Sequence, residues 1–81
     1  MKIMHNTLGG DHVINENTQF NNAILESLIV GENVETKIYG TIINDLTIHK
    51  GAIVHVYGRV LGETINNGGV IHFYPPTDPN V

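Results

Sequence analysis

A short pattern that recurs at a nearly constant spacing is the feature that most limits the folds open to this chain. The segment Ile38–Ile42 (IYGTI) matches Val56–Val60 (VYGRV) at an offset of 18 in the numbering, and a weaker copy, Phe20–Ile24 (FNNAI), lies upstream at the same offset. Segments this alike at one constant spacing are typical of solenoids, in which each coil rests on the coil before it. The repeat therefore predicts a stack of similar coils.

Asparagine or glycine occupies one place in each repeat, at Asn17, Asn33, Gly51 and Gly68. These two residue types tolerate the left-handed backbone, so the column predicts a corner with positive φ in every coil. The last repeat is one residue shorter, because Thr47–His49 and His55–Tyr57 map onto Thr64–Asn66 and His72–Tyr74 at an offset of 17. We expect the missing residue at another corner, near Gly62.

Between the corners, apolar residues alternate with polar ones, which is the period of a strand with one buried face. The sequence thus predicts an all-β, single-domain parallel β-helix of about four turns, with three short strands in each turn and like residues stacked ~4.8 Å apart. A meander or sandwich is the second choice, since neither explains why residues one repeat apart are so alike. We expect residues 1–12 to form an N-terminal cap, 13–74 the turns and 75–81 a loose tail.

The alternation also predicts which side chains fill the interior. The expected inward residues are Ile14, Phe20, Ile24, Leu28, Val30, Val34, Ile38, Ile42, Leu46, Ile48, Val54, Val56, Val60, Ile65, Ile71 and Phe73.

Two outward columns are candidates for an oligomer interface. Leu25, Ile43 and Leu61 each follow an inward residue at matching places in the repeat, which predicts a stripe of large aliphatic side chains on the surface. Tyr39, Tyr57 and Tyr74 form a second outward column. Apolar surface flanked by tyrosine is typical of surfaces that associate. The alternative is that like residues pack on one another only to stabilise the sheet.

Composition excludes several classes of function. Four Lys and Arg stand against eight Asp and Glu, for a net charge of -4, so the basic footprint of a nucleic-acid partner is absent. No stretch approaches the ~20 apolar residues of a membrane span. The chain contains no Cys, which removes disulfides, thiolate metal sites and a cysteine nucleophile and is compatible with the cytoplasm.

Histidine offers the one possible ligand face. His55 and His72 should be neighbours on adjacent turns, and two imidazoles can begin a zinc or copper site. The equivalent residue one turn earlier is Lys37, which supplies no third ligand, so we predict neither a metal nor a cofactor.

The residues needed for catalysis are also missing, because no nucleophile is paired with a base and an orienting group. Glu26, Asp45 and Glu63 lie at a corner, where carboxylates cap turns. We therefore expect a protein that is not an enzyme.

The spacing of glycine and aliphatic residues over about residues 12–74 resembles that of the bactofilins, bacterial cytoskeletal proteins that form polymers and are built on a right-handed parallel β-helix. The matching stretches are Leu28-x-Val30-Gly31, Ile38-x-Gly40-x-Ile42, Leu46-x-Ile48-x-x-Gly51-Ala52, Val56-x-Gly58-x-Val60-x-Gly62 and Asn67-Gly68-Gly69. The resemblance implies a nucleotide-independent scaffold whose partner is itself, and we expect the protein in the cytoplasm. Its copies would join end to end through their terminal turns, as a homo-oligomer or a polymer.

A competing resemblance is to the hexapeptide-repeat proteins, which are left-handed β-helices. Aliphatic residues or threonine recur at every sixth position, at Ile24, Val30, Thr36, Ile42, Ile48, Val54 and Val60. This second resemblance implies an oligomer that binds or transforms a small molecule between subunits, with His55 or His72 as a base. The hexapeptide pattern is incomplete, so we favour the right-handed coil and the structural role.

Overall fold

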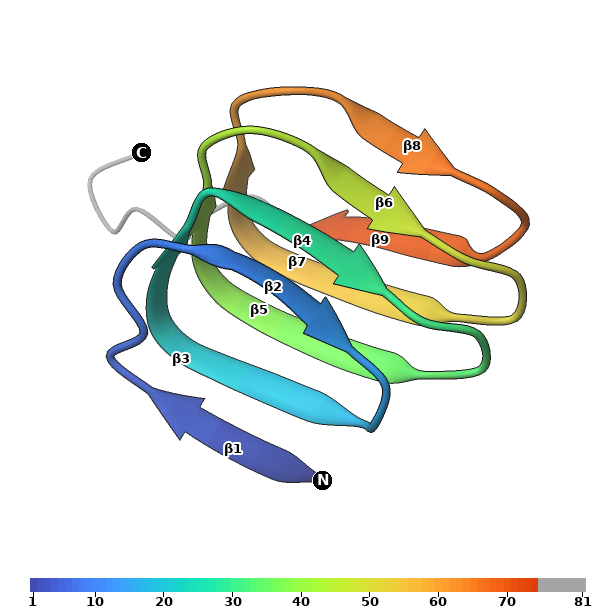
Figure 1. Cartoon of the computed structure of the whole chain (residues 1–81), viewed down its shortest axis with the longest axis horizontal. Helices are drawn as coiled ribbons and strands as arrows, with labels where there is room; N and C mark the ends of the chain where they lie inside the picture. Colours follow the sequence, from blue (N-terminus) through green and yellow to red (C-terminus); the bar gives the residue numbers. More distant parts are fainter. Residues whose placement is uncertain (75–81) are drawn as a thin grey trace.

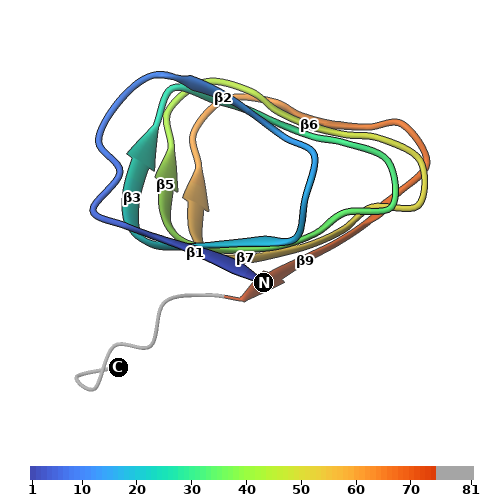
Figure 2. The same cartoon turned by 60° about the horizontal axis from the view of Figure 1, so that its bottom comes forward.

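Two parallel sheets face each other across one apolar core in the computed structural model, which describes residues 1–74 (Figures 1 and 2). One sheet has the order β1-β3-β5-β7-β9 and the other β2-β4-β6-β8, so the chain passes from sheet to sheet as it winds. The strands are β1 (Lys2–His5), β2 (Asp11–Ile14), β3 (Thr18–Leu25), β4 (Ser27–Val30), β5 (Glu35–Ile42), β6 (Leu46–Ile48), β7 (Ile53–Val60), β8 (Thr64–Asn66) and β9 (Val70–Tyr74). The predicted all-β solenoid of about four turns is confirmed.

The long strands β3, β5 and β7 each bend sharply, so that one strand forms two sides of a turn (Figure 2). Ala23, Gly40 and Gly58 are neighbours at the bend. A Cβ atom on Gly58 would lie 1.9 Å from the carbonyl oxygen of Gly40, so only a residue without a side chain fits. In the turns that contain β3, β5 and β7, two of the three predicted short strands are therefore joined into one bent strand.

The predicted repeat, with its offset of 18, is visible in the pairing of β5 with β7, where Tyr39 lies opposite Tyr57. The position of the shortened repeat was predicted wrongly. Ile48 pairs with Asn66 at an offset of 18, whereas the offset is 17 throughout the pairing of β7 with β9, from Ile53 and Val70 onward. The missing residue thus lies between β8 and β9 and not near Gly62, and this turns Ile65 outward.

The predicted corner is confirmed in three of its four places. Asn33, Gly51 and Gly68 have φ values of 59°, 76° and 105°, in the left-handed region. Asn17 is not among the residues with positive φ. Instead, its side-chain oxygen accepts a hydrogen bond of 2.8 Å from the backbone amide of Glu35, one turn further along.

A bulge in β3 overturns one part of the predicted core. Asn21 pairs with Tyr39 but Ala23 pairs with Gly40, so β3 holds one extra residue at Asn22, whose φ is 58°. The extra residue moves every later side chain in β3 to the opposite face. Leu25 is consequently 0% exposed and belongs to the core, whereas Ile24 is 46% exposed and faces outward.

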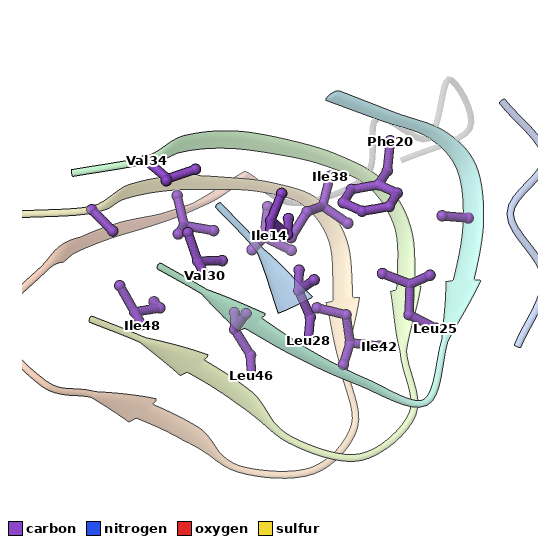
Figure 3. Close-up of a cluster of buried hydrophobic side chains, with 14 residues drawn as sticks. Ile14, Phe20, Leu25, Leu28, Val30, Val34, Ile38, Ile42, Leu46 and Ile48 are labelled. Carbon is purple, nitrogen blue, oxygen red and sulfur yellow. The ribbon is translucent and has the colours of Figure 1, made fainter. Parts of the chain in front are cut away.

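The interior is a column of aliphatic side chains with one aromatic ring (Figure 3). Its buried members are Ile14, Phe20, Ala23, Leu25, Leu28, Val30, Val34, Ile38, Ile42, Leu46, Ile48, Ala52, Val54 and Val56. Val60 and Ile71 are partly buried against this core, while Phe73, although inward, is 54% exposed in the last described turn. The residues predicted to form an N-terminal cap contain β1 and the start of β2, which pair in parallel with β3 and β4. The predicted loose tail lies outside the described residues.

Two buried threonines differ in how their hydroxyls are satisfied. Thr18 and Thr36 are neighbours in one inward column, and both are fully buried. The Thr18 hydroxyl donates a hydrogen bond of 2.8 Å to the carbonyl oxygen of Glu16, but the Thr36 hydroxyl has no partner among the described residues. A buried hydroxyl without a partner destabilises the folded state.

Truncation at two adjacent residues tests the bulge. Leu25→Ala should lower the free energy of unfolding by about 2–5 kcal/mol, because it opens a cavity in the core. Ile24→Ala should change it by about 0.5 kcal/mol, as expected for a surface residue. Urea unfolding followed by circular dichroism measures both. The reverse order would show that β3 keeps a regular register.

Replacing the two threonines by valine should affect stability differently. Thr36→Val removes a hydroxyl that has no partner, so we expect the free energy of unfolding to rise by about 1 kcal/mol. Thr18→Val is the matched control in the same column, and it should not stabilise, because it leaves the Glu16 carbonyl oxygen without its donor. Equal effects of the two changes in urea unfolding would contradict this assignment.

Candidate functional site

Three tyrosines form a continuous stack on the outer face of the five-stranded sheet. The ring centroids of Tyr39 and Tyr57 are 4.5 Å apart, as are those of Tyr57 and Tyr74, with interplanar angles of 6° and 10°. Parallel pairing places the three residues at matching positions of β5, β7 and β9. The predicted column is therefore formed, although the ring faces are largely covered by one another.

A second column lies beside the tyrosines and contains Lys37, His55 and His72. The two imidazole rings stack at 5.3 Å with an interplanar angle of 15°. The structure thus brings together both histidines of the expected ligand face. No group of three His, Cys, Asp or Glu side chains that could hold a metal ion occurs in the part of the chain that the structure describes.

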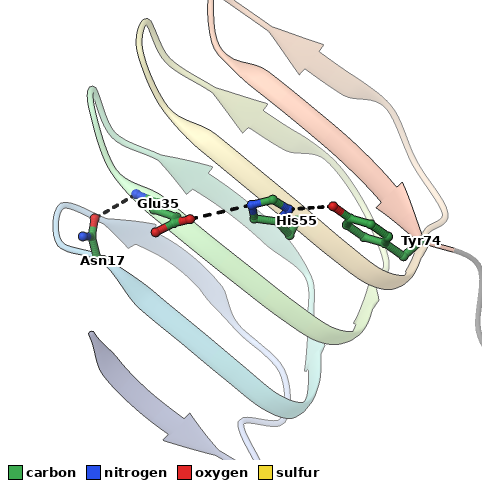
Figure 4. Close-up of polar contacts among 4 residues, drawn as sticks. All are labelled: Asn17, Glu35, His55 and Tyr74. Atoms are coloured by element: carbon green, nitrogen blue, oxygen red, sulfur yellow. Dashed lines mark hydrogen bonds and ion pairs between the residues drawn. The ribbon is translucent and has the colours of Figure 1, made fainter.

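His55 is at the centre of a line of polar contacts across successive turns (Figure 4). Its Nδ1 lies 3.1 Å from the hydroxyl of Tyr74, and its Nε2 lies 3.7 Å from Oε2 of Glu35. The backbone amide of Glu35 in turn donates to Asn17. These contacts join β5, β7 and β9 from outside. Protonation of the imidazole would add an ion pair with Glu35.

The expected aliphatic stripe is smaller than predicted. Leu25 is buried in the core because of the bulge, so it cannot take part in a surface contact. Ile43 and Leu61 are exposed at 43% and 64%, at matching places just after β5 and β7. The bend at Gly40 and Gly58 separates this pair from the tyrosine column.

The corner carboxylates bind backbone amides. Oε2 of Glu26 accepts from the amide of Gly10 at 3.0 Å, and Oδ1 of Asp45 accepts from the amide of Glu63 at 3.1 Å. For Glu26 and Asp45 the interpretation as turn caps is confirmed.

At the C-terminal end of the described solenoid, side chains at inward positions of β9 are not covered by a further turn. Phe73 follows Val56 and Ile71 follows Val54, in columns that are fully buried one turn earlier. Within residues 1–74 no strand covers β8 or β9 from the far side. Within the described residues, Phe73 is therefore left 54% exposed at this end of the core.

The N-terminal end is hollow. A cavity of about 440 Å³ opens there, and its lining residues are Lys2, Met4, His12, Val13, Ile14, Asn15, Glu16, Thr18 and Phe20. Two inward positions of the first turn, Lys2 and Gly9, carry no compact apolar side chain. Gly9 lies opposite Leu25, because Leu8 pairs with Ile24. Lys2 lies opposite Thr18, and its amine is 3.6 Å from the carboxylate of Glu16. The first turn consequently fails to fill its own interior.

Sequence reasoning pointed to the terminal turns only through the bactofilin resemblance and named no residue at either end as a candidate interface residue. It assigned residues 1–12 to a closing cap and counted Phe73 as core. The available signal was the chemistry at inward places of the outermost turns, where Lys2, Gly9, Thr64 and Asn66 replace aliphatic residues.

Comparisons with known proteins add no relative, since no family model, curated protein or solved structure matches the chain. Residues 1–74 form no helix of the length and apolar character that a membrane span requires.

The tyrosine stack should be visible in an alkaline titration. Partial burial between the two neighbouring rings raises the pKa of the Tyr57 phenol, and the charges of ionised Tyr39 and Tyr74 raise it further. The folded protein holds this proton more tightly than the unfolded chain, so stability should fall as pH rises past the ordinary tyrosine value. Phenolate absorbance against pH should show a late transition that Tyr57→Phe removes. A late transition that survives Tyr57→Phe would contradict the assignment.

Proposed function

We propose that this chain is a non-enzymatic structural module that self-assembles end to end, in the manner implied by its resemblance to the bactofilins. The observation that carries the proposal is that, within residues 1–74, no strand covers either end of the solenoid. Phe73 and Ile71 leave apolar surface at one end, and a hollow opens at the other. A right-handed coil and a cytoplasmic location are part of the same proposal and rest on the resemblance.

Backbone chemistry supports assembly along the axis. The edge strands β1 and β2 at one end, and β8 and β9 at the other, present amide and carbonyl groups without a strand partner on their outer side within residues 1–74. Such edges pair readily with another chain unless charge, proline or a covering segment blocks them. A second copy can supply both the hydrogen bonds and the missing apolar contacts.

The outer tyrosine column and the Ile43–Leu61 pair support a lateral contact less well. The tyrosine faces are already stacked on one another, so a partner laid on this surface would meet mainly ring edges and hydroxyls. Tyr39, Tyr57 and Tyr74 thus fit the ladder-packing alternative, in which like residues stabilise the sheet.

Mass measured by light scattering during size-exclusion chromatography, over a wide range of protein concentration, tests the proposal. We expect the mass to grow with concentration and Phe73→Glu to reduce that growth, because a carboxylate at the end contact must be desolvated. Leu61→Glu is the control on the side of the solenoid and should assemble as the parent does. A parent chain that stays monomeric at every concentration would overturn the proposal.

A further inference from the structure

We propose that the hollow at the N-terminal end is a binding site for a small organic carboxylate with an apolar body, such as a medium-chain fatty acid. Lys2 would pair with the carboxylate at the mouth, and the hydrocarbon would lie against Met4 and Phe20. The inference does not depend on self-assembly. Pairing between copies would use the backbone edges of strands, whereas the ligand occupies the interior of the first turn.

Two inward positions of the first turn carry polar side chains next to this cavity. Lys2 pairs with Thr18, which is fully buried one turn later. His12 pairs with Leu28, which pairs in turn with Leu46, and both leucines are fully buried. Polar groups at inward positions need hydrogen-bond or charge partners. A ligand with one polar end can supply such a partner.

The rest of the lining includes apolar contacts. Phe20 and Ile14 are core residues with 1% and 6% exposure, and Met4 is packed against the same core. The thioether of Met4 is flexible enough to adapt to the shape of a ligand. The cavity volume of about 440 Å³ lies within the range of roughly 300–1,000 Å³ that is usual for small-molecule sites. This part of the lining favours a ligand whose body is a hydrocarbon.

The ammonium group of Lys2 is only loosely paired within the chain. Its Nζ is 3.6 Å from Oε1 of Glu16, which is longer than an N–H···O hydrogen bond, and both side chains are more than half exposed. Exposed ion pairs of this kind contribute little to stability. The ammonium group therefore retains donors for a carboxylate, and hydrogen bonds between such charged groups are shorter and stronger than those between neutral groups.

The imidazole of His12 is a second group that a carboxylate can use. Its Nε2 lies 3.0 Å from the carbonyl oxygen of Gly9. Because a carbonyl oxygen only accepts, Nε2 carries the hydrogen, and a neutral ring has its lone pair on Nδ1. Nδ1 makes no hydrogen bond to another group of residues 1–74. When Nδ1 is also protonated, the ring can donate to a bound carboxylate, so binding should take up a proton.

Acid should therefore strengthen binding. The charged groups around His12 are Lys2 and Glu16 in the same lining, Asp11 beside it in β2, and Glu26 at the corner after β3. Carboxylates and ammonium groups ordinarily keep their charge between pH 8 and pH 5.5, whereas imidazole titrates within that range. We expect octanoate to bind several-fold more tightly at pH 5.5 than at pH 8.

Three probes of equal chain length distinguish what the site recognises. Isothermal titration calorimetry of the full chain with octanoate should show binding, with 1-octanol weaker and octylamine weaker still, because the amine would meet the charge of Lys2. Equal affinity for all three would mean that only the hydrocarbon is recognised, which overturns the carboxylate assignment. Tighter binding of octylamine than of octanoate would overturn it in favour of Glu16. If none of the three binds, the hollow is not a site for this class of ligand.

Three variants locate the site, with circular dichroism and urea unfolding to establish that each is folded. Lys2→Met keeps the hydrocarbon stem but removes the charge, so octanoate affinity should fall by roughly five- to tenfold while 1-octanol affinity is unchanged. Lys37→Met, in the column of His55, is the matched control and should bind octanoate as the parent does. His12→Leu introduces the residue type that the next two turns hold at this position, and it should abolish the pH dependence. Equal losses in the two lysine variants, or a pH dependence that survives His12→Leu, would contradict the site.

Discussion

The rest of the structure depends on in-register parallel pairing, which places each side chain ~4.8 Å from its counterparts on the turns before and after. Each residue in a column must therefore pack against its counterparts on the adjacent turns. Flat rings satisfy this at Tyr39, Tyr57 and Tyr74, which stack face to face. At the bend, the Gly58 backbone comes so close to Gly40 that no side chain fits between them.

That same constraint explains which parts of the fold could be predicted from sequence. Tyr39 and Tyr57, or Gly40 and Gly58, recur at one constant offset because each pair shares a column, so their likeness shows both the repeat and the face. The bulge at Asn22 could not be predicted in this way. Counting by the repeat assigns Ile24 to the core, whereas one extra residue in β3 buries Leu25 instead.

The candidate sites were harder to predict because they occur where the repeat stops. β1 pairs with β3 at an offset of 16, and Lys2–His5 shares almost no residue types with Thr18–Asn21, so nothing in the sequence distinguishes a first turn from a cap. At the other end, Phe73 has the apolar character of the core. Its exposure follows only from the absence of a covering turn within residues 1–74.

The outer tyrosine face and the ends of the solenoid differ in how much stabilisation a partner could add. On the outer face, each tyrosine ring already packs against its neighbours, so a lateral partner would add contacts only at ring edges. Within residues 1–74, Phe73 at one end and the hollow beside Met4 at the other lack the neighbour that every interior turn provides. The larger gain from apolar burial and backbone pairing therefore lies along the axis.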